Sequence, residues 1–476
     1  MMTRTKPNIF KLTAMAAAAL ALAGCASVNF DQAVSNANQT TNSFTGGKLE
    51  LSRSAGQNDA RAKLAVDLLA KPLSSDDAVQ LALANSPAVQ TMLAQSWADM
   101  SAANQAGRIA NPVFAFERVT YKNELELGRL LSFGLLDILT LPRRHAIAQS
   151  RIAQSQVQLS SSVVELVTQV RQAWVRAVAA SQVLQYAEQI NTTADASAEL
   201  ARRMQQVGNF NKLQRARQQV FYADSTVRLA LAQHGALAAR EDLVRQLGLT
   251  DAQAPLLKLP ERLPDLPKEA RTPGQVNSTA TDQRLDVQLA RSQLDVAGKA
   301  QGLNLLTSLV DVELGIRRDT VFDNGAGRTF AKRGFELDIR LPIFDWGNAR
   351  RDAMNAQSLA AANRYESTVR SATSQLRESY SAYRTAYDVA RHYRDEVVPL
   401  RKTMAEENLL RYNGMLIGVF ELLADTRDQI SSVVTAINAY QQFWLADAAL
   451  SASMTGKPAA MMMAAPAAAG IQAPAH

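Results

Sequence analysis

The chain has 476 residues, of which 47% are hydrophobic and 20% charged, and its formal net charge is +7. This length is ample for a sizeable core, and the composition excludes a chain that is disordered throughout. After residue 25 the sequence has no apolar run of about 18 residues, which excludes a membrane protein built from several transmembrane helices.

Residues 1–24 predict a secretory signal peptide. Arg4, Lys6 and Lys11 form a basic segment, and an apolar segment follows over residues 12–23. Removal of residues 1–24 takes away three cations and no anions, so the net charge falls from +7 to +4. This mild charge gives no electrostatic footprint for nucleic acid, and we expect no nucleic-acid partner.

The signal peptide ends in Leu22-Ala23-Gly24-Cys25, which resembles a bacterial lipobox. The resemblance implies that Cys25, the only cysteine, is acylated and begins the mature chain. Ala26 stands where an aspartate would indicate retention in the inner membrane, so the resemblance points to the outer membrane. The alternative is a spare thiol after an ordinary signal peptide.

Two similar halves, residues 73–250 and 279–452, follow an N-terminal segment over residues 25–72 that we expect to be irregular. The motif Leu93-Ala94-Gln95-Ser96 recurs as Leu289-Ala290-Arg291-Ser292, and three single residues, Gly107, Pro142 and Gly208, have counterparts at Gly302, Pro342 and Gly414. The offsets of 195 to 206 residues keep the same order, which indicates a tandem duplication; the alternative is chance matches. We expect a proline-rich, non-helical linker over residues 251–278 and a disordered Ala/Met/Pro tail over residues 453–476.

Each half is predicted to contain a helix, two strands, a long helix and a further helix. The long helices, 143–206 and 351–412, exceed 60 residues each and would extend roughly 90 Å. Apolar or small residues alternate four-three spacings along both, which is typical of a coiled-coil seam. Pro142 and Pro342 are expected where a strand passes into the first turn of a helix.

The predicted strands carry the most information about function. Residues 310–317 and 335–341 alternate strictly between apolar and polar or glycine positions, whereas 113–121 and 127–135 alternate less cleanly and carry several aromatic residues. Strict alternation gives a sheet one apolar and one polar face. One interpretation is a sheet in water that helices cover. In a membrane, the polar face would line water with Asp311, Glu313, Arg317, Glu336, Asp338 and Arg340.

Four strands are too few to close a membrane barrel, and an open sheet edge in lipid leaves backbone groups unsatisfied. A membrane location for these strands therefore requires an oligomer.

Residues 73–87, Asn111-Pro112 and residues 341–347 (Leu-Pro-Ile-Phe-Asp-Trp-Gly) resemble segments of the outer membrane factor family. These TolC-like channels serve tripartite efflux pumps and type I secretion systems, and the resemblance covers residues 73–452. It implies a mainly α fold with a small β part: a homotrimer with a 12-stranded outer membrane barrel and a long periplasmic α-helical barrel. It also implies two partners, a periplasmic adaptor protein and an inner-membrane transporter.

The resemblance places two helix-hairpin tips at the adaptor. The expected docking residues are Val207, Gly208 and Asn209 in the first tip and Gly414, Met415 and Leu416 in the second. We expect each glycine to end its helix in a left-handed conformation, which would explain both glycines without any partner. Candidates for a gate that closes the tunnel are Arg411, Tyr412, Asp425 and Asp428, and the alternative is that these side chains form ordinary solvated or inter-helix pairs. Lys212, Arg215 and Arg217 make the first tip basic.

Enzymatic function is disfavoured, and we expect no cofactor. The chain has no His-Glu-x-x-His motif, no Gly-x-Ser-x-Gly motif and no complete phosphate loop. The four histidines are widely separated, and Met461-Met462-Met463 lies in a low-complexity tail, so no metal site is predicted.

The sequence thus predicts a passive, trimeric exit duct for small molecules, drugs or metal ions, in the outer membrane of a Gram-negative bacterium. Two alternatives stay open. One is the exit channel of a type I protein exporter, and the other is a lipid-anchored periplasmic coiled-coil scaffold without a pore.

Overall fold

The structure, a computed structural model, describes residues 29–276, 281–307, 311–340 and 343–458. The signal peptide, Cys25, Pro342 and Met461-Met462-Met463 lie outside these ranges. Chain contacts define two compact units. Among the described residues, we call them the strand unit (residues 29–33, 94–158, 288–307, 311–340 and 343–368) and the hairpin unit (residues 34–93, 159–276, 281–287 and 369–458).

The fold is mainly α-helical with one small antiparallel sheet, as predicted. In the first half the elements are α2 (Phe30–Thr45), α3 (Ala55–Leu69), α4 (Ser75–Asn85), α5 (Pro87–Ala106), β1 (Val113–Tyr121), β2 (Glu124–Gly134), α6 (Leu135–Gln206) and α7 (Lys212–Leu247). The linker carries η1 (Ala254–Leu256), α8 (Pro273–Val276) and η2 (Thr281–Gln283). The second half has α9 (Leu285–Thr307), β3 (Asp311–Asp323), β4 (Arg328–Arg340), α10 (Asn348–His392), the π-helical η3 (Tyr393–Val397), α11 (Val398–Asn413) and α12 (Val419–Thr455).

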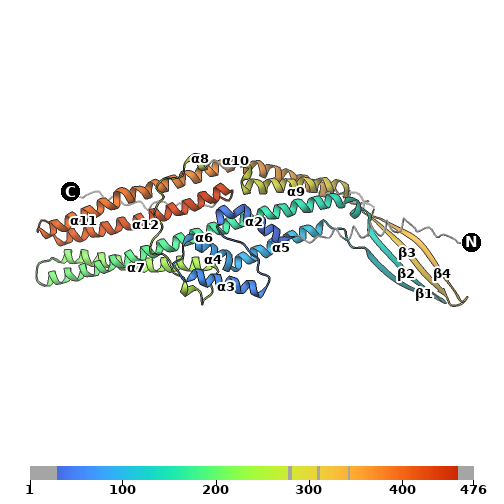
Figure 1. Cartoon of the computed structure of the whole chain (residues 1–476), viewed down its shortest axis with the longest axis horizontal. Helices are drawn as coiled ribbons and strands as arrows, with labels where there is room; N and C mark the ends of the chain where they lie inside the picture. The colour runs from blue at the N-terminus through green and yellow to red at the C-terminus, as the bar shows by residue number, and fades with distance from the viewer. Residues whose placement is uncertain (1–28, 277–280, 308–310, 341–342, 459–476) are drawn as a thin grey trace, which may run out of the picture. The chain divides into compact units, whose positions relative to one another are not determined.

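The strand unit contains the sheet, whose strands lie side by side in the order β1-β2-β3-β4 (Figure 1). Each neighbouring pair is antiparallel, with Leu131 on β2 opposite Ile316 on β3 and Ile316 opposite Phe335 on β4. The second hairpin is longer than the strict alternation predicts, because it continues through a charged segment to a tight turn. There the Asp323 carboxylate accepts hydrogen bonds from the backbone N–H groups of Gly325 (3.0 Å) and Ala326 (2.9 Å).

The hairpin unit contains the long antiparallel helix pairs. Figure 1 shows α7 running back beside α6, and α12 running back beside α11. Most of the predicted seam is buried: Val163, Val170, Ala173 and Ala177 on α6 are at most 1% exposed. Tyr383, Tyr387 and Phe443 form an aromatic core between α10 and α12, and the Tyr387 hydroxyl donates to the Pro267 carbonyl at 3.1 Å. The linker is thereby fixed to the helices.

The N-terminal segment is not irregular, so that expectation was wrong. It forms α2 and α3, and α3 starts in a capping box in which Ser54 accepts from the Gln57 backbone and Gln57 accepts from the Ser54 backbone. On α2 the buried Phe30, Ala33, Val34 and Ala37 follow helical spacing. The polar residues between them lie on the outer face. They make the composition of the segment polar overall, and for this reason the helix was not predicted.

Pro142 is not in the first turn of a helix, as it was predicted to be. α6 begins earlier, at Leu135, and Pro142 lies inside it. An ion pair spans this turn, with Arg144 2.6 Å from Asp137, and the Thr140 hydroxyl donates to the Leu136 carbonyl at 2.6 Å. These side-chain contacts therefore stabilise the part of α6 that precedes Pro142.

The predicted helix 351–412 is interrupted by the π-helical segment η3. Pro399 follows immediately, and its missing N–H removes one donor from the regular helical pattern. A single wide turn next to a proline is a common way to absorb this loss. At the end of the second half, α12 runs to Thr455 and Gly456 caps it in the left-handed conformation, so the described tail starts later than predicted.

Across the described residues, none of the helices combines the length and hydropathy that crossing a bilayer requires.

Candidate functional site

The sheet has one polar and one apolar face, and the strand register assigns every residue to one of them. On the polar face, Glu313 lies opposite Asp338, Gly315 opposite Glu336, and Asp311 opposite Arg340. The six residues predicted to line water, Asp311, Glu313, Arg317, Glu336, Asp338 and Arg340, thus share one face by register. Their assignment to a channel lumen stays a prediction.

Ion pairs tie the polar face together across strands. Arg317 lies 2.9 Å from Asp319 and 3.1 Å from Glu117 on β1, and Lys332 lies 3.2 Å from Glu126 on β2. The register puts all nine carboxylates of the four strands on this face, against four basic residues. A water-filled path along it would therefore favour cations.

The opposite face is apolar and exposed. One row crosses all four strands, with Phe114 opposite Leu131, Leu131 opposite Ile316 and Ile316 opposite Phe335. Phe114 is 64% exposed and Phe335 81% exposed. The sequence of β3 and β4 predicts an apolar face. β1 and β2, whose residues alternate less cleanly, complete that face. A contiguous exposed apolar surface of this kind indicates contact with lipid or protein.

The first helix-hairpin tip turns at Gly208, whose φ is +81°. The Asn209 N–H donates to the Met204 carbonyl at 2.9 Å, and Asn211 caps α7 by accepting from the Gln214 N–H. An added Cβ at Gly208 would meet nothing within 4 Å, so backbone conformation alone requires glycine there. The left-handed glycine is confirmed in this tip.

The second tip differs from the prediction. Gly414 has φ −80°, and Met415 takes the left-handed conformation with φ +60°. The Leu416 N–H donates to the Arg411 carbonyl at 2.8 Å and so satisfies the last turn of α11. Met415 is 93% exposed, although a left-handed conformation disfavours a side chain. The tip therefore presents Met415 and Leu416 to its surroundings.

An aromatic contact joins the two tips. The rings of Phe210 and Phe420 lie 4.4 Å apart between centroids, and both residues follow the turn of their hairpin. Sequence analysis missed this pair; the phenylalanine shortly after each tip glycine is the signal that identifies it.

The gate candidates are only partly brought together. Asp425 is half-buried, and its Oδ2 atom has no hydrogen-bond partner within the described part of the chain. Asp428 lies 3.5 Å from Arg427, which also stacks over the Phe221 ring. Among the described residues, the side chains of Arg411 and Tyr412 make no ion pair or hydrogen bond with either aspartate. In the basic first tip, Arg215 donates to Gln205 at 2.7 Å, and its Nε atom is buried without a described partner.

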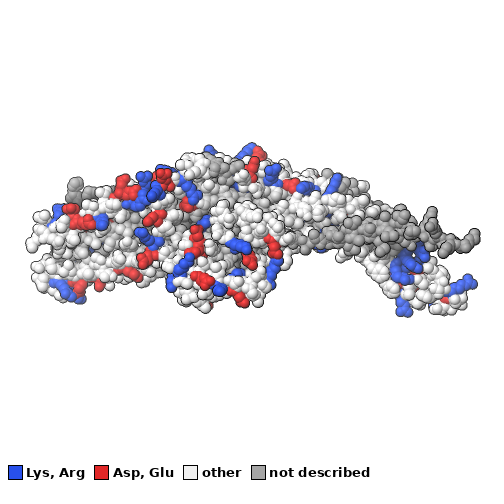
Figure 2. All heavy atoms as spheres, viewed as in Figure 1, with Lys and Arg blue, Asp and Glu red and all other residues white. Residues whose placement is uncertain are grey.

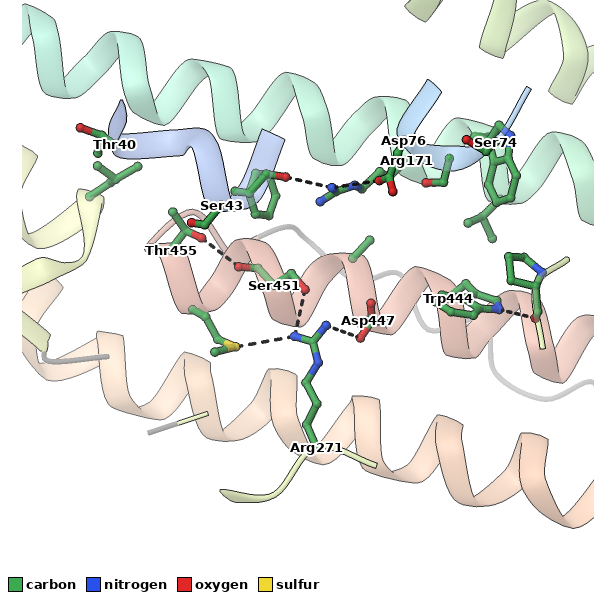
Figure 3. Close-up of a pocket in the computed structure, with 18 of the residues that line it drawn as sticks. Thr40, Ser43, Ser74, Asp76, Arg171, Arg271, Trp444, Asp447, Ser451 and Thr455 are labelled. Atoms are coloured by element: carbon green, nitrogen blue, oxygen red, sulfur yellow. Dashed lines mark hydrogen bonds and ion pairs between the residues drawn. The ribbon is translucent and has the colours of Figure 1, made fainter. Parts of the chain in front are cut away.

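A cavity of about 840 Å³, lined by both polar and apolar side chains, lies within the hairpin unit (Figure 3). Arg271 lies 2.9 Å from Asp447 on α12 and donates to Ser451 at 3.1 Å. On another wall, Arg171 lies 3.7 Å from Asp76 and donates to the Phe44 carbonyl. Figure 3 shows the Arg271 and Asp447 side chains directed toward one another. Sequence analysis missed this cluster because its members come from four separate segments.

Burial dominates the electrostatics of this cavity. It raises the pKa of Asp447, with Arg271 and Arg171 acting in the opposite direction. It also lowers the pKa of Arg171, against the attraction of Asp76 and Asp447. One ion pair joins the linker to α12 and the other joins α4 to α6, which fits a structural role.

Residues 280–406 match the family model of outer membrane efflux proteins. The matched segment includes α9, β3, β4 and α10. No curated protein sequence matches this chain significantly.

The chain shares its fold with solved outer membrane channels. The Campylobacter jejuni CmeC outer membrane channel is 14% identical, with a TM-score of 0.65 over 84% of this chain and 86% of that one. The open state of the Neisseria gonorrhoeae MtrE outer membrane channel is 18% identical, with a TM-score of 0.64 over 81% and 89%. The Vibrio cholerae outer membrane protein VceC is 14% identical, with a TM-score of 0.63 over 80% and 96%. At these identities the likeness establishes the shared fold.

Proposed function

We propose that this protein is the passive outer membrane exit duct of a tripartite efflux pump. It would pass small molecules, drugs or metal ions, from an inner-membrane transporter through a periplasmic adaptor. The observation that carries the proposal is the two-faced sheet in a chain with an outer membrane efflux domain. A face of exposed phenylalanine, leucine and isoleucine suits lipid, and a face of carboxylates and ion pairs suits water.

Sheet closure supports a homotrimer. β1 and β4 are the two edges of the sheet, and an open edge in lipid leaves backbone groups unsatisfied. Three copies supply 12 strands, above the minimum of about eight for a membrane barrel. In that arrangement β4 of one protomer pairs with β1 of the next.

Docking of the adaptor is proposed for the two tips. Val207, Met415 and Leu416 are each more than two-thirds exposed, and the Phe210–Phe420 contact holds the tips together. Gly208, Asn209 and Gly414 shape the turns. The adaptor would cover this apolar surface.

The gate is proposed to use Asp425. Its unpartnered buried oxygen requires a donor, which a neighbouring protomer of the trimer would supply. Asp428, Arg411 and Tyr412 lie within a few turns of the same tip. Lipid attachment at Cys25 and an outer membrane location complete the proposal.

Planar-bilayer recording tests the duct. Purified protein is added to a lipid bilayer, and we expect discrete, cation-favouring conductance steps. A pore-less coiled-coil scaffold predicts no conductance. A type I exporter predicts conductance with a different partner, so pull-down of the inner-membrane component separates it from an efflux pump: an ATP-driven exporter would contradict the proposed cargo.

A further inference from the structure

Three arginines lie in one row across the apolar face of the sheet. The register sets Arg129 on β2 opposite Arg318 on β3, and Arg318 opposite Arg333 on β4. On β1 the row ends at Phe116. All three arginines are exposed. Figure 2 shows basic side chains gathered over the sheet, with little acidic surface beside them.

This row has no internal charge balance. The register puts Arg118, Arg129, Arg318 and Arg333 on the apolar face, and it puts every carboxylate of the four strands on the other. Arg129 donates to Thr320, and within the described ranges neither Arg318 nor Arg333 has a carboxylate partner. Like charges directly opposite one another destabilise a sheet, so the row calls for an external anion.

The position of the row along the strands indicates which anion. On β4 the apolar face runs from Ile339 back to Phe335, on the helix side of Arg333. A membrane-crossing strand needs about 9–11 residues. Counted back from Arg340, the last residue of β4, that length ends between Lys332 and Phe330, just past Arg333. The arginines thus lie near the hairpin-turn end of that span, away from the helices.

We propose that Arg129, Arg318 and Arg333 bind the phosphate groups of a phosphorylated lipid of the outer leaflet. The inference rests on the proposed function, because that function puts the helices in the periplasm and the hairpin turns outside. Neighbouring strands lie about 4.8 Å apart, so three guanidinium groups span roughly 10 Å and can engage more than one phosphate. Guanidinium and phosphate form paired, charge-assisted hydrogen bonds. The lipid thereby offsets the repulsion within the row and fixes the depth of the sheet in the membrane.

The test is a titration followed by native mass spectrometry. Detergent-solubilised full-length protein is titrated with diphosphorylated lipid A and with its dephosphorylated form. We expect the wild type to bind the phosphorylated form at least about 10-fold more tightly, because the charge-assisted hydrogen bonds between guanidinium and phosphate are lost with the phosphates. Equal binding of the two forms by the wild type would overturn the site without any variant.

Matched variants locate the binding to one face. The Arg318→Gln/Arg333→Gln variant is expected to lose the preference for phosphate. The Arg328→Gln/Lys332→Gln variant removes two cations from the polar face of the same hairpin, and it is expected to stay within about twofold of the wild type. Equal losses in both variants, or no loss in the first, would overturn the proposal.

Recording the same wild-type preparation in a planar bilayer separates the two proposals. Conductance steps together with no phosphate preference overturn the arginine site alone. Lack of conductance with no phosphate preference overturns the duct, and the arginine site with it.

Discussion

Phe335 and Glu336 are neighbours on β4 whose side chains lie on opposite faces of the sheet. Phe335 is 81% exposed and pairs with Ile316, whereas Glu336 pairs with Gly315 on the carboxylate-rich face. This single step along the strand separates the surface assigned to lipid from the surface assigned to water.

The first prediction uses this pair. Phe335→Lys puts a cation into lipid at a cost of about 2–4 kcal/mol per protomer near the midplane, so we expect little assembled protein in the outer membrane. Glu336→Lys puts the same charge on the polar face, so normal assembly with weaker cation preference is expected. Membrane fractionation and reversal potentials measure the two effects. Equal assembly of both variants would contradict the assignment of the faces.

The second prediction concerns the tips. Leu416→Glu adds a charge to a side chain that is 74% exposed, and we expect loss of efflux with oligomers intact, because the apolar docking surface is broken. Leu416 is a better position than Gly208, where any side chain also strains the backbone. Drug or metal accumulation in cells measures efflux, and crosslinking measures the oligomer.

The control for the tips is Leu256→Glu, which adds the same charge to an exposed leucine in the linker segment η1. This variant should pump normally. Normal efflux by Leu416→Glu itself would exclude the second tip from adaptor docking.

The third prediction tests the gate. Asp425→Asn keeps the shape of the side chain but removes the charge at the unpartnered buried oxygen, so we expect a higher single-channel conductance or a leakier closed state. Asp428→Asn is the matched control, because Asp428 is near Arg427 and an exposed pair of this kind contributes at most about 1 kcal/mol. Identical conductance in wild type and Asp425→Asn would identify Asp425 as an ordinary helix residue.

The fourth prediction is a pH dependence of stability. Burial raises the pKa of Asp447 above its ordinary value of 3.8, so the folded protein binds this proton more readily than the unfolded chain does. The contribution of this proton to stability is therefore complete below pH 3.8 and is lost as the pH rises through the higher folded-state pKa. We expect the melting temperature of the wild type, minus that of Asp447→Asn, to increase as the pH falls toward 3.8.

The melting temperature of Asp447→Asn must be subtracted because other carboxylates also change the stability with pH. Hydrogen bonds and lysine partners lower the pKa values of Asp77 and Asp295. The contribution of these carboxylates to the stability of the folded protein is therefore lost on acidification. Both carboxylates are present in the wild type and in Asp447→Asn, so their effects on the melting temperature cancel in the difference. A difference that shrinks on acidification would contradict the raised pKa of Asp447.

Much of the fold could be predicted from the sequence, because its signals are local. Period-two alternation identified the strands of the second half, and four-three spacing identified the seam of α6. The lipid-facing row from Phe114 to Phe335 could be anticipated only in part, since the register between strands decides which phenylalanines share a face.

Other features depend on contacts that short-range patterns do not contain. Arg271 and Asp447 are far apart in the sequence and meet only after the linker packs on α12. Met415, and not Gly414, takes the left-handed conformation, because the hydrogen bond from the Leu416 N–H to the Arg411 carbonyl fixes the turn one residue later. The helix α2 was missed because its apolar stripe is narrow and the residues around it are polar.

Single-particle imaging tests the central claim most directly. Protein extracted from outer membranes in mild detergent is imaged, and the account predicts particles with threefold symmetry in which β4 of one protomer pairs with β1 of the next to close the sheet. Monomers, or coiled coils whose sheet edges stay unpaired, would contradict the trimeric duct.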